Sequence, residues 1–462
     1  MGFTYDADNR LLGVSDWLKR ETSYTYGPAS NLTRIAFPNT VISALNYDAA
    51  SRVTGITDSA NSVAYRVLAY TMDKVGNRTK VTDNSVATNY AYDAVNELLS
   101  STRGTAKTSW TYDAVGNRIE QIAPTGTTSY TYDVDDRMLT AGSTTFTYDA
   151  NGDTLSDPSG KAYTWDFENR LVQAVVPGTN GGTTTFKYDP FGRRIYKSSP
   201  DWTGAFVYDG RNLIETLNSS GAIVADYTQT RNIDETLAGY RSGASSYYEA
   251  DSLESITSLS SSTGALANTY TYDSFGNLTN STGTLSNPFQ YTGREFDSET
   301  GLYYYRARYY DPTAGRFVSE DPIRFQGGSN FYRYAKNNVV NATDPWGLCP
   351  CTEPSAPYQG DIPFGHVPWD EPFGPNTSAA YGNATGGPFN NNLAHVSKQF
   401  GNNIWSNCVR GCLLSAWNPC TKQYIPNFYY AHAVCFKACT LGFLTDLTLV
   451  GIQMQTGIPL YP

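Results

Sequence analysis

Residues 108–118 read Thr-Ser-Trp-Thr-Tyr-Asp-Ala-Val-Gly-Asn-Arg, and this stretch decides the fold. Its first half places Trp110 and Tyr112 at alternate positions between hydroxyl residues, and period-two alternation is typical of a strand with one buried face. Its second half is turn chemistry, because Asp113 can bond its own backbone and Gly116 or Asn117 accepts a positive φ. The stretch therefore predicts a strand, a tight turn and a return strand.

The same unit recurs about every 16 to 24 residues through the first three quarters of the chain. Clear copies begin at Tyr188 and Tyr272, and looser copies begin at Tyr47, Tyr92, Tyr132, Tyr148, Trp165 and Tyr208. The 36 tyrosines of the 462-residue chain suit such pleated, half-buried strands. Each unit buries its apolar face only against its neighbours, so the pattern predicts a mainly β repeat array.

Charge and hydropathy argue against several other classes of protein. The formal net charge of −10 argues against nucleic-acid binding by the shell, because phosphate contacts need clustered Lys and Arg. There is no 18-residue apolar run, so no membrane span is expected. Residues 1–30 lack the pattern of a signal peptide. Because Met1 opens within a repeat (Tyr5–Arg10), we expect a fragment of a longer protein.

A longer and more specific motif follows the repeats. Residues 301–312 read Gly-Leu-Tyr-Tyr-Tyr-Arg-Ala-Arg-Tyr-Tyr-Asp-Pro, and the motif ends at 344–348 as Asp-Pro-Trp-Gly-Leu. In these features the chain resembles the bacterial Rhs/YD-repeat family: residues 1–294 resemble its repeats and residues 295–348 its repeat-associated core. The resemblance implies a spiralling antiparallel β-sheet that winds into a hollow shell around a C-terminal cargo. An open solenoid without cargo is the alternative that the repeats alone leave open.

The resemblance also implies self-cleavage between Leu348 and Cys349. Two carboxylates that share one proton can hydrolyse a peptide bond without a metal, since their repulsion separates their pKa values into one acid and one base. We expect Asp321 and Asp344 in these roles, with Asp311 as the substitute. Either Arg316 or Arg308 is expected to hold a carboxylate ionised or to stabilise the oxyanion. No cofactor or metal is expected in this reaction, and an Asp-Pro pair is also ordinary turn chemistry.

The chain changes character after Leu348. Every cysteine and histidine lies beyond it: Cys349, Cys351, Cys408, Cys412, Cys420, Cys435, Cys439, His366, His395 and His432. Residues 349–392 are rich in Pro, Gly and Asn and are predicted to be a linker. Residues 393–462 carry apolar positions at helical spacing, which predicts a small Cys-rich helical hairpin where the family holds a variable toxin. Each histidine is expected to be packed or solvated.

The tail cysteines form two C-x-x-x-C pairs. The index sums of Cys408 with Cys439 and of Cys412 with Cys435 are both 847. That equality matches an antiparallel hairpin whose turn is centred between Gln423 and Tyr424. Two disulfides or one four-thiolate zinc site satisfy the same arithmetic. The resemblance favours the disulfides, because cargo of this family is exported.

The size of the array predicts an open or partly wound shell. A strand residue covers roughly 16 Å² of sheet, so 348 residues with realistic strand content cover about 3,500 Å². Enclosing a compact tail of 114 residues needs about 6,000 Å². We therefore expect upstream repeats to complete the shell.

The function that these features imply is an Rhs-type toxin-delivery module that encloses and releases an effector. Its expected partners are a cognate immunity protein, the upstream repeats and a secretion component, and its expected location is secreted or at the bacterial cell surface. The alternatives are a cell-surface or carbohydrate-contacting repeat protein with a structural tail, and a degenerate inactive fragment. Which toxin the tail holds does not follow from the sequence.

Overall fold

The computed structural model describes residues 1–179, 181–348, 351–352, 417–418 and 423–424. The chain divides into two compact units, Met1–Gly360 and Asp361–Pro462. The first unit holds the repeats and the core motif, and all of the sites described below lie in it. In the second unit, β36 (Trp417–Asn418) pairs antiparallel with β37 (Gln423–Tyr424).

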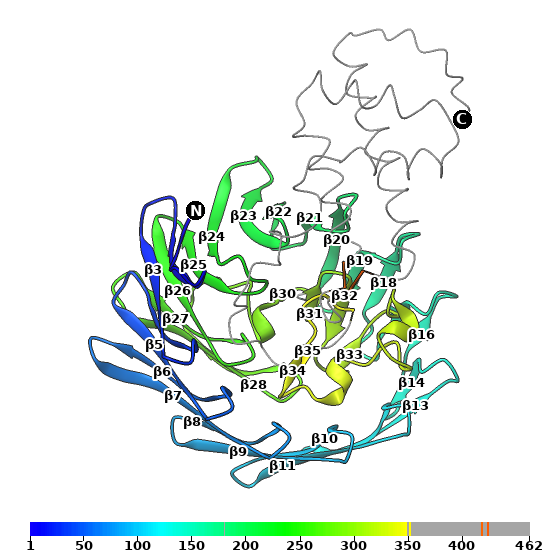
Figure 1. Ribbon diagram of the computed structural model, residues 1–462. Helices are drawn as coiled ribbons and strands as arrows, with labels where there is room; N and C mark the ends of the chain where they lie inside the picture. Colours follow the sequence, from blue (N-terminus) through cyan, green and yellow to red (C-terminus); the bar gives the residue numbers. More distant parts are fainter. Residues whose placement is uncertain (180, 349–350, 353–416, 419–422, 425–462) are drawn as a thin grey trace, which may run out of the picture. The chain divides into compact units, whose positions relative to one another are not determined.

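Most strands of the first unit belong to two large antiparallel sheets in which each strand pairs with the next in sequence (Figure 1). The 15-stranded sheet contains β1 (Gly2–Tyr5), β2 (Leu11–Ser15), β3 (Glu21–Tyr26), β4 (Leu32–Ala36), β5 (Val41–Tyr47), β6 (Val53–Ala60), β7 (Val63–Met72), β8 (Arg78–Asp83), β9 (Val86–Tyr92), β10 (Leu98–Arg103), β11 (Ala106–Tyr112), β12 (Arg118–Ala123), β13 (Gly126–Tyr132), β14 (Met138–Ala141) and β15 (Thr144–Thr145). The 14-stranded sheet contains β16 (Thr147–Tyr148), β17 (Thr154–Ser156), β18 (Ala162–Trp165), β19 (Leu171–Val176), β20 (Gly182–Tyr188), β21 (Arg194–Ser198), β22 (Thr203–Asp209), β23 (Asn212–Asn218), β24 (Ile223–Gln229), β25 (Thr236–Arg241), β26 (Ala244–Ala250), β27 (Ile256–Ser261), β28 (Leu266–Tyr272) and β29 (Leu278–Thr282).

The aspartate of each repeat builds its turn. Asp113 Oδ1 accepts hydrogen bonds from the backbone N–H of Val115 at 3.0 Å and of Asn117 at 2.8 Å. Gly116 has a φ of +86°, which a residue with a Cβ adopts only under strain. Six copies add an ion pair from the aspartate to an arginine four residues later: Asp6–Arg10, Asp16–Arg20, Asp48–Arg52, Asp133–Arg137, Asp166–Arg170 and Asp189–Arg193. The turn is therefore specified within five residues of sequence.

In eight repeats the tyrosine ties its strand to an earlier strand of the array. Tyr112 Oη donates to the carbonyl oxygen of Leu98 at 2.9 Å, and Leu98 opens the preceding strand. The same bond recurs in seven further copies: Tyr26 to Leu11, Tyr47 to Leu32, Tyr92 to Arg78, Tyr132 to Arg118, Tyr148 to Met138, Tyr188 to Leu171 and Tyr272 to Ile256. We call these eight bonds the tyrosine ladder. They satisfy both the buried hydroxyl and a backbone acceptor at the sheet surface.

The sheet winds back on itself, so that early strands contact late ones. Figure 1 shows β3 to β7 beside β25 to β28. Asn39 Nδ2 donates to Ser260 Oγ at 2.8 Å, and Arg66 Nη1 donates to the Thr257 carbonyl oxygen at 2.9 Å. A shared apolar cluster lies at this seam: Val14, Tyr24, Leu32, Phe37, Val41, Leu237, Ala238 and Tyr247. The spiral is thus held by contacts between residues about 200 positions apart.

The core motif lies within the curve of the large sheets (Figure 1). Its four-stranded sheet contains β30 (Glu295–Asp297), β31 (Leu302–Tyr305), β32 (Arg308–Asp311) and β33 (Arg316–Phe317). The 3₁₀ turns η1 (Tyr291–Gly293), η2 (Arg324–Gln326) and η3 (Ala335–Asn337) and the pair β34 (Ala342–Thr343) with β35 (Cys351–Thr352) complete it. Buried aromatic rings join it to the large sheets: Tyr303, Tyr305, Tyr310, Phe317 and Tyr334 pack in one cluster with Leu98, Trp110 and Phe275.

Repeat turns hold the core motif through their glycine carbonyl oxygens. The donors are core side chains: Asn337 Nδ2 to Gly116 at 2.8 Å, Tyr332 Oη to Gly152 at 2.7 Å, Tyr304 Oη to Gly192 at 3.2 Å and Tyr303 Oη to Gly276 at 3.0 Å. The approach is close, since a Cβ added at Gly116 would lie 2.2 Å from Nη1 of Arg333. These glycines therefore provide contact with the core as well as turn geometry.

The expected mainly β fold with large antiparallel sheets is confirmed. Among the described residues, β1 and β29 each pair on one side only, so the two ends of the array are not joined to each other. In this part of the chain no helix is long and apolar enough to cross a membrane. The predicted linker and helical hairpin fall almost wholly outside the described residues. Gln423 and Tyr424 form strand β37, however, and do not flank the centre of a turn as expected.

Candidate active site

Asp344 begins a tight turn at the end of the core motif. It follows β34, and its carbonyl oxygen accepts the N–H of Gly347 at 3.1 Å. Its Oδ1 accepts the N–H of Leu348 at 3.0 Å. Gly347 has a φ of +65°, and a Cβ there would lie 2.6 Å from the carbonyl oxygen of Tyr305. The sequence Asp-Pro-Trp-Gly-Leu at 344–348 thus folds Leu348 back onto Asp344.

Asp321 approaches the same place from another loop. Its backbone N–H donates to the Phe331 carbonyl oxygen at 3.0 Å, and its Oδ1 accepts the N–H of Ile323 at 3.0 Å. These bonds leave Oδ2 directed at Arg308. The two aspartates are buried, with exposed fractions of 5% for Asp321 and 1% for Asp344. Asp-Pro turn chemistry therefore positions a second buried carboxylate beside the first.

Arg308, on β32, joins both carboxylates to the backbone beside Leu348. Its Nη2 lies 2.9 Å from Asp321 Oδ2 and 3.5 Å from Asp344 Oδ2. Its Nε donates to the Gly347 carbonyl oxygen at 2.5 Å, and its guanidinium lies 3.7 Å from the ring centroid of Phe317. The buried, planar guanidinium of Arg308 therefore holds Asp321, Asp344 and the Gly347 backbone in fixed relative positions.

Because Gly327 has no side chain, an Asp321 oxygen and the Leu348 carbonyl oxygen can both lie close to its Cα. A Cβ built on Gly327 would lie 2.4 Å from Asp321 Oδ2 and 2.9 Å from the Leu348 oxygen. The two oxygens are therefore no further apart than the sum of these distances, 5.3 Å. Both contacts are too short for a real Cβ, so a side chain here would displace one of the two groups. Our interpretation of the sequence missed Gly327, although the Gly327-Gly328 pair marks a loop that needs backbone freedom.

The environment sets the protonation of this pair of acids. Burial, with a smaller contribution from the Asp344 charge and against the opposing effect of Arg308, raises the pKa of Asp321 to about 7. Burial lowers the pKa of Arg308 from its usual value. A guanidinium stays charged at neutral pH even so. With its pKa raised in this way, Asp321 can hold a proton near neutral pH, which suits a group that gives up a proton in a reaction.

Asp311 and Arg316 lie in other contacts. Asp311 Oδ1 accepts the N–H groups of Thr313 and Ala314, which makes it the capping residue of the β32–β33 turn. Arg316 Nη2 donates to the Asp136 carbonyl oxygen at 2.6 Å, and its guanidinium lies over the rings of Tyr132 and Tyr332. Of the two arginines expected at the acids, the structure brings Arg308 to them. Cys349, the cysteine pairs Cys408–Cys439 and Cys412–Cys435, and His366, His395 and His432 lie outside the described residues.

A spiral of Tyr-Asp hairpins around an aromatic core motif defines the class of repeat-shell proteins. Residues 69–340, more than half of the chain, match the family model described as Teneurin YD-shell, and the chain belongs to that family. The resemblance to Rhs/YD-repeat proteins is therefore confirmed.

Bacterial relatives match part of this chain. It is 32% identical over 209 residues to the tRNA3(Ser)-specific nuclease WapA of Bacillus spizizenii, covering 43% of this chain and 9% of that protein. It is 27% identical over 218 residues to the double-stranded DNA deaminase toxin A of Burkholderia cenocepacia, covering 40% and 15% respectively. The chain thus spans a small part of these relatives.

A solved structure shares the fold. The crystal structure described as TcdB2-TccC3-Cdc42 superposes with a TM-score of 0.64 at 22% identity, over 75% of this chain and 20% of that one. A structure of TcdB2-TccC3 without its hypervariable C-terminal region gives the same TM-score at 23% identity. At this identity the likeness concerns the fold of the shell.

Proposed function

We propose that this chain is the C-terminal module of an Rhs-type toxin-delivery protein, whose β-shell encloses an effector and releases it by cutting its own chain between Leu348 and Cys349. The observation that carries this proposal is the pair of buried acids, Asp321 and Asp344, on one arginine beside the Leu348 carbonyl group. The region beyond Leu348 then takes the position of the effector.

In the proposed reaction, ionised Asp344 takes a proton from a water molecule while the water oxygen bonds to the Leu348 carbonyl carbon. Protonated Asp321 gives its proton to the leaving nitrogen of Cys349 as the carbon–nitrogen bond breaks. The products are a carboxyl group on Leu348 and an amine on Cys349, and the two aspartates have exchanged protonation states. Arg308 holds the Gly347 carbonyl oxygen, so the reacting bond stays in place without a binding step.

Related proteins support an effector in the tail. Their names describe a tRNA nuclease, a DNA deaminase toxin and, in Dickeya dadantii, a probable deoxyribonuclease, RhsA. Because this chain covers only 9% to 15% of these proteins, we propose that upstream repeats and a secretion component act with it. A cognate immunity protein and secretion or display at the bacterial surface belong to the same proposal.

The tyrosine ladder argues against the alternative of a carbohydrate-contacting surface. In eight repeats the tyrosine hydroxyl is already bonded to the backbone of the neighbouring strand. A hydroxyl used in this way is unavailable as a donor for a sugar. The hydroxyl groups of these eight tyrosines therefore serve the shell.

Intact mass and gel analysis of the purified chain test the proposal. Wild type should yield a fragment that begins at Cys349 and has about a quarter of the 50.7 kDa chain mass, in proportion to 114 of its 462 residues. Asp344→Asn should stay uncut. Asp311→Asn is the matched control, because it alters a third Asp-Pro element away from the acid pair and should cleave normally. An uncut wild-type chain would refute self-cleavage, and loss of cleavage in the Asp311 variant alone would reassign the acids.

A further inference from the structure

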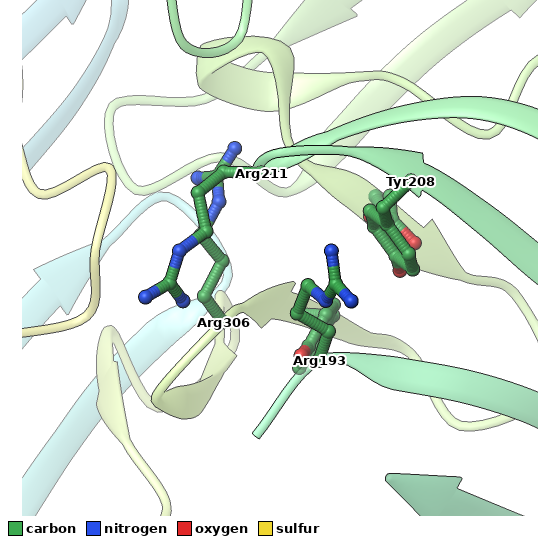
Figure 2. Close-up of a pocket in the computed structure, with 6 residues that line it drawn as sticks. Arg193, Tyr208, Arg211 and Arg306 are labelled. Carbon is green, nitrogen blue, oxygen red and sulfur yellow. The ribbon is translucent and has the colours of Figure 1, made fainter. Parts of the chain in front are cut away.

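A small pocket lies where three turns meet. It is lined by Arg193, Tyr208, Arg211, Glu295, Tyr304 and Arg306. Figure 2 shows the three arginine side chains and Tyr208 grouped around the same space. Arg193 comes from the β20–β21 turn, Arg211 from the β22–β23 turn and Arg306 from the β31–β32 turn. We call this the three-arginine pocket.

Acidic partners account for two of the three guanidinium groups. Arg193 pairs with Asp189 at 2.6 Å, and Arg306 pairs with Asp234 at 2.7 Å. Among the described residues no carboxylate lies within 4.0 Å of Arg211. Its guanidinium instead lies 5.2 Å from the ring centroid of Trp346. The pocket therefore holds one more positive charge than its ion pairs balance.

The remaining acids near the pocket are already shared. Asp234 also pairs with Arg294. Glu295 pairs with Arg194 at 2.8 Å. Burial and the neighbouring charges of Arg306 and Arg193 lower the pKa of Arg211. An unbalanced cation in a partly buried site is costly unless an anion or a dense set of acceptors accompanies it.

Two buried donors of the same pocket also lack a partner among the described residues. They are Tyr208 Oη and Arg306 Nε. A buried donor without an acceptor destabilises the folded chain. The unpaired donors and the excess positive charge thus belong to residues that line one space, and a single acceptor with negative charge placed there would serve both.

We propose that the three-arginine pocket binds one small monovalent anion of the size of chloride. The pocket is partly open to solvent and its cavity volume of about 10 Å³ is about what one water molecule needs, which favours a single-atom anion over phosphate or sulfate. Chloride accepts hydrogen bonds from guanidinium and hydroxyl groups and, because it is spherical, accepts them from any direction. Arg211, Arg306 and Tyr208 are its expected ligands.

An anion here would stabilise the contacts that Arg211 and Arg306 make with the cleavage motif. Trp346 contacts both Arg211 and Arg306, whose guanidinium groups are 5.2 Å and 5.7 Å from its ring centroid. Arg306 Nη1 also donates to the Pro345 carbonyl oxygen at 2.5 Å. Neutralising the repulsion between the two arginines would hold both on the ring.

Binding is tested on the full Asp344→Asn chain, so the outcome does not depend on self-cleavage. Thermal unfolding is measured in sodium chloride and in sodium gluconate at one ionic strength, which keeps screening constant. Chloride should raise Tm by about 2 °C or more over gluconate, whose anion is too large for the pocket. Broadening of the ³⁵Cl NMR line by the protein is the second measurement.

Variants then locate the site. Arg211→Gln should abolish both the Tm difference and the line broadening, whereas Arg103→Gln, at an exposed arginine, should keep them. Tyr208→Phe should weaken both, and it serves as the test if the Arg211 variant fails to fold. Equal Tm values in the two salts without line broadening, or a full chloride effect in the folded Arg211 and Tyr208 variants, would overturn the proposal.

Discussion

The Nε–H of Arg308 donates a hydrogen bond to the carbonyl oxygen of Gly347, with 2.5 Å between nitrogen and oxygen. The other guanidinium nitrogens of Arg308 contact Asp321, Asp344 and the Phe331 carbonyl oxygen. One side chain thereby sets the distance between the two acids and the backbone that precedes Leu348. The expected self-cleavage therefore depends on this contact as well as on the two aspartates.

Arg308→Lys should slow self-cleavage about 100-fold, the scale on which removal of one positioned donor acts. An ammonium group cannot span Gly347, Phe331 and both acids as the planar guanidinium does. Pulse-chase gels of freshly translated chain would follow the rate. Arg316→Lys is the control, because Arg316 contacts Asp136 and aromatic rings instead. Cleavage of the Arg308 variant at the wild-type rate would contradict the assignment.

Gly327→Ala should slow cleavage while the shell stays folded. The new methyl group would lie 2.4 Å from Asp321 Oδ2 and 2.9 Å from the Leu348 oxygen, so the two groups must separate. The φ of Gly327 is −81°, so alanine introduces no backbone strain. Gel rates report cleavage, and thermal unfolding of the uncut form checks the fold. Normal cleavage with normal stability would mean that the two oxygens do not meet during the reaction.

The cleavage rate should fall as pH rises through about 7. The reaction needs the proton of Asp321, and burial raises the pKa of that carboxyl to about 7, so the proton is present below this pH and lost above it. Cell-free translation followed by transfer to buffers of pH 6 to 9 would give the profile. A rate that climbs steadily over this range would show that Asp321 acts in its ionised form.

Asp58→Asn should stabilise the shell near neutral pH by up to about 3 kcal/mol, at 1.36 kcal/mol per pKa unit. Asp58 is fully buried, its Oδ1 accepts from Ser43 Oγ at 2.5 Å, and burial raises its pKa from 3.8 to about 6. A raised folded pKa gives stability that is complete below about 3.8 and lost as pH rises to about 6.

Urea unfolding between pH 4 and 8 tests that change. The Asp58→Asn variant should lose part of the decline in stability that wild type shows between pH 4 and 6. Asp209→Asn, at the exposed end of β22, should leave the decline intact. Identical pH profiles of wild type and the Asp58 variant would show that the buried carboxyl does not control stability.

Tyr112→Phe should lower the free energy of unfolding by about 1–2 kcal/mol. The change removes one bond of the tyrosine ladder and leaves the Leu98 carbonyl oxygen without that donor. Tyr5→Phe is the matched control, since Tyr5 holds the same place in the first repeat but is 38% exposed. Denaturant unfolding of uncut chains measures both, and equal effects would show that the ladder bond adds no stability.

The repeats could be predicted because their information is local. Asp113, Gly116 and Asn117 specify a turn through bonds that span four residues, and Trp110 and Tyr112 mark the buried face of the strand. Asp321 and Asp344 are candidates through the resemblance to the Rhs/YD-repeat family, since both stand in Asp-Pro elements of its core motif. Tyrosine abundance predicted strands, but the bond of each hydroxyl to the previous strand was not predicted.

Other features depend on residues that are distant in sequence and meet only in the folded chain. The contact of the two acids with Arg308 is one such feature. Arg308 and Arg316 both lie in the core sheet, and only the folded chain shows which of them has Asp321 and Asp344 beside it. Gly327 and the three-arginine pocket are others, since each brings together residues from separate segments of the chain. The amino-acid sequence by itself determined the strand-and-turn unit, its repetition and the acidic motif, because these rest on neighbours along the chain. The tertiary structure alone decided that Arg308 contacts the two acids and that, among the described residues, Arg211 has no paired carboxylate. The reason is that burial and electrostatics depend on neighbours in space.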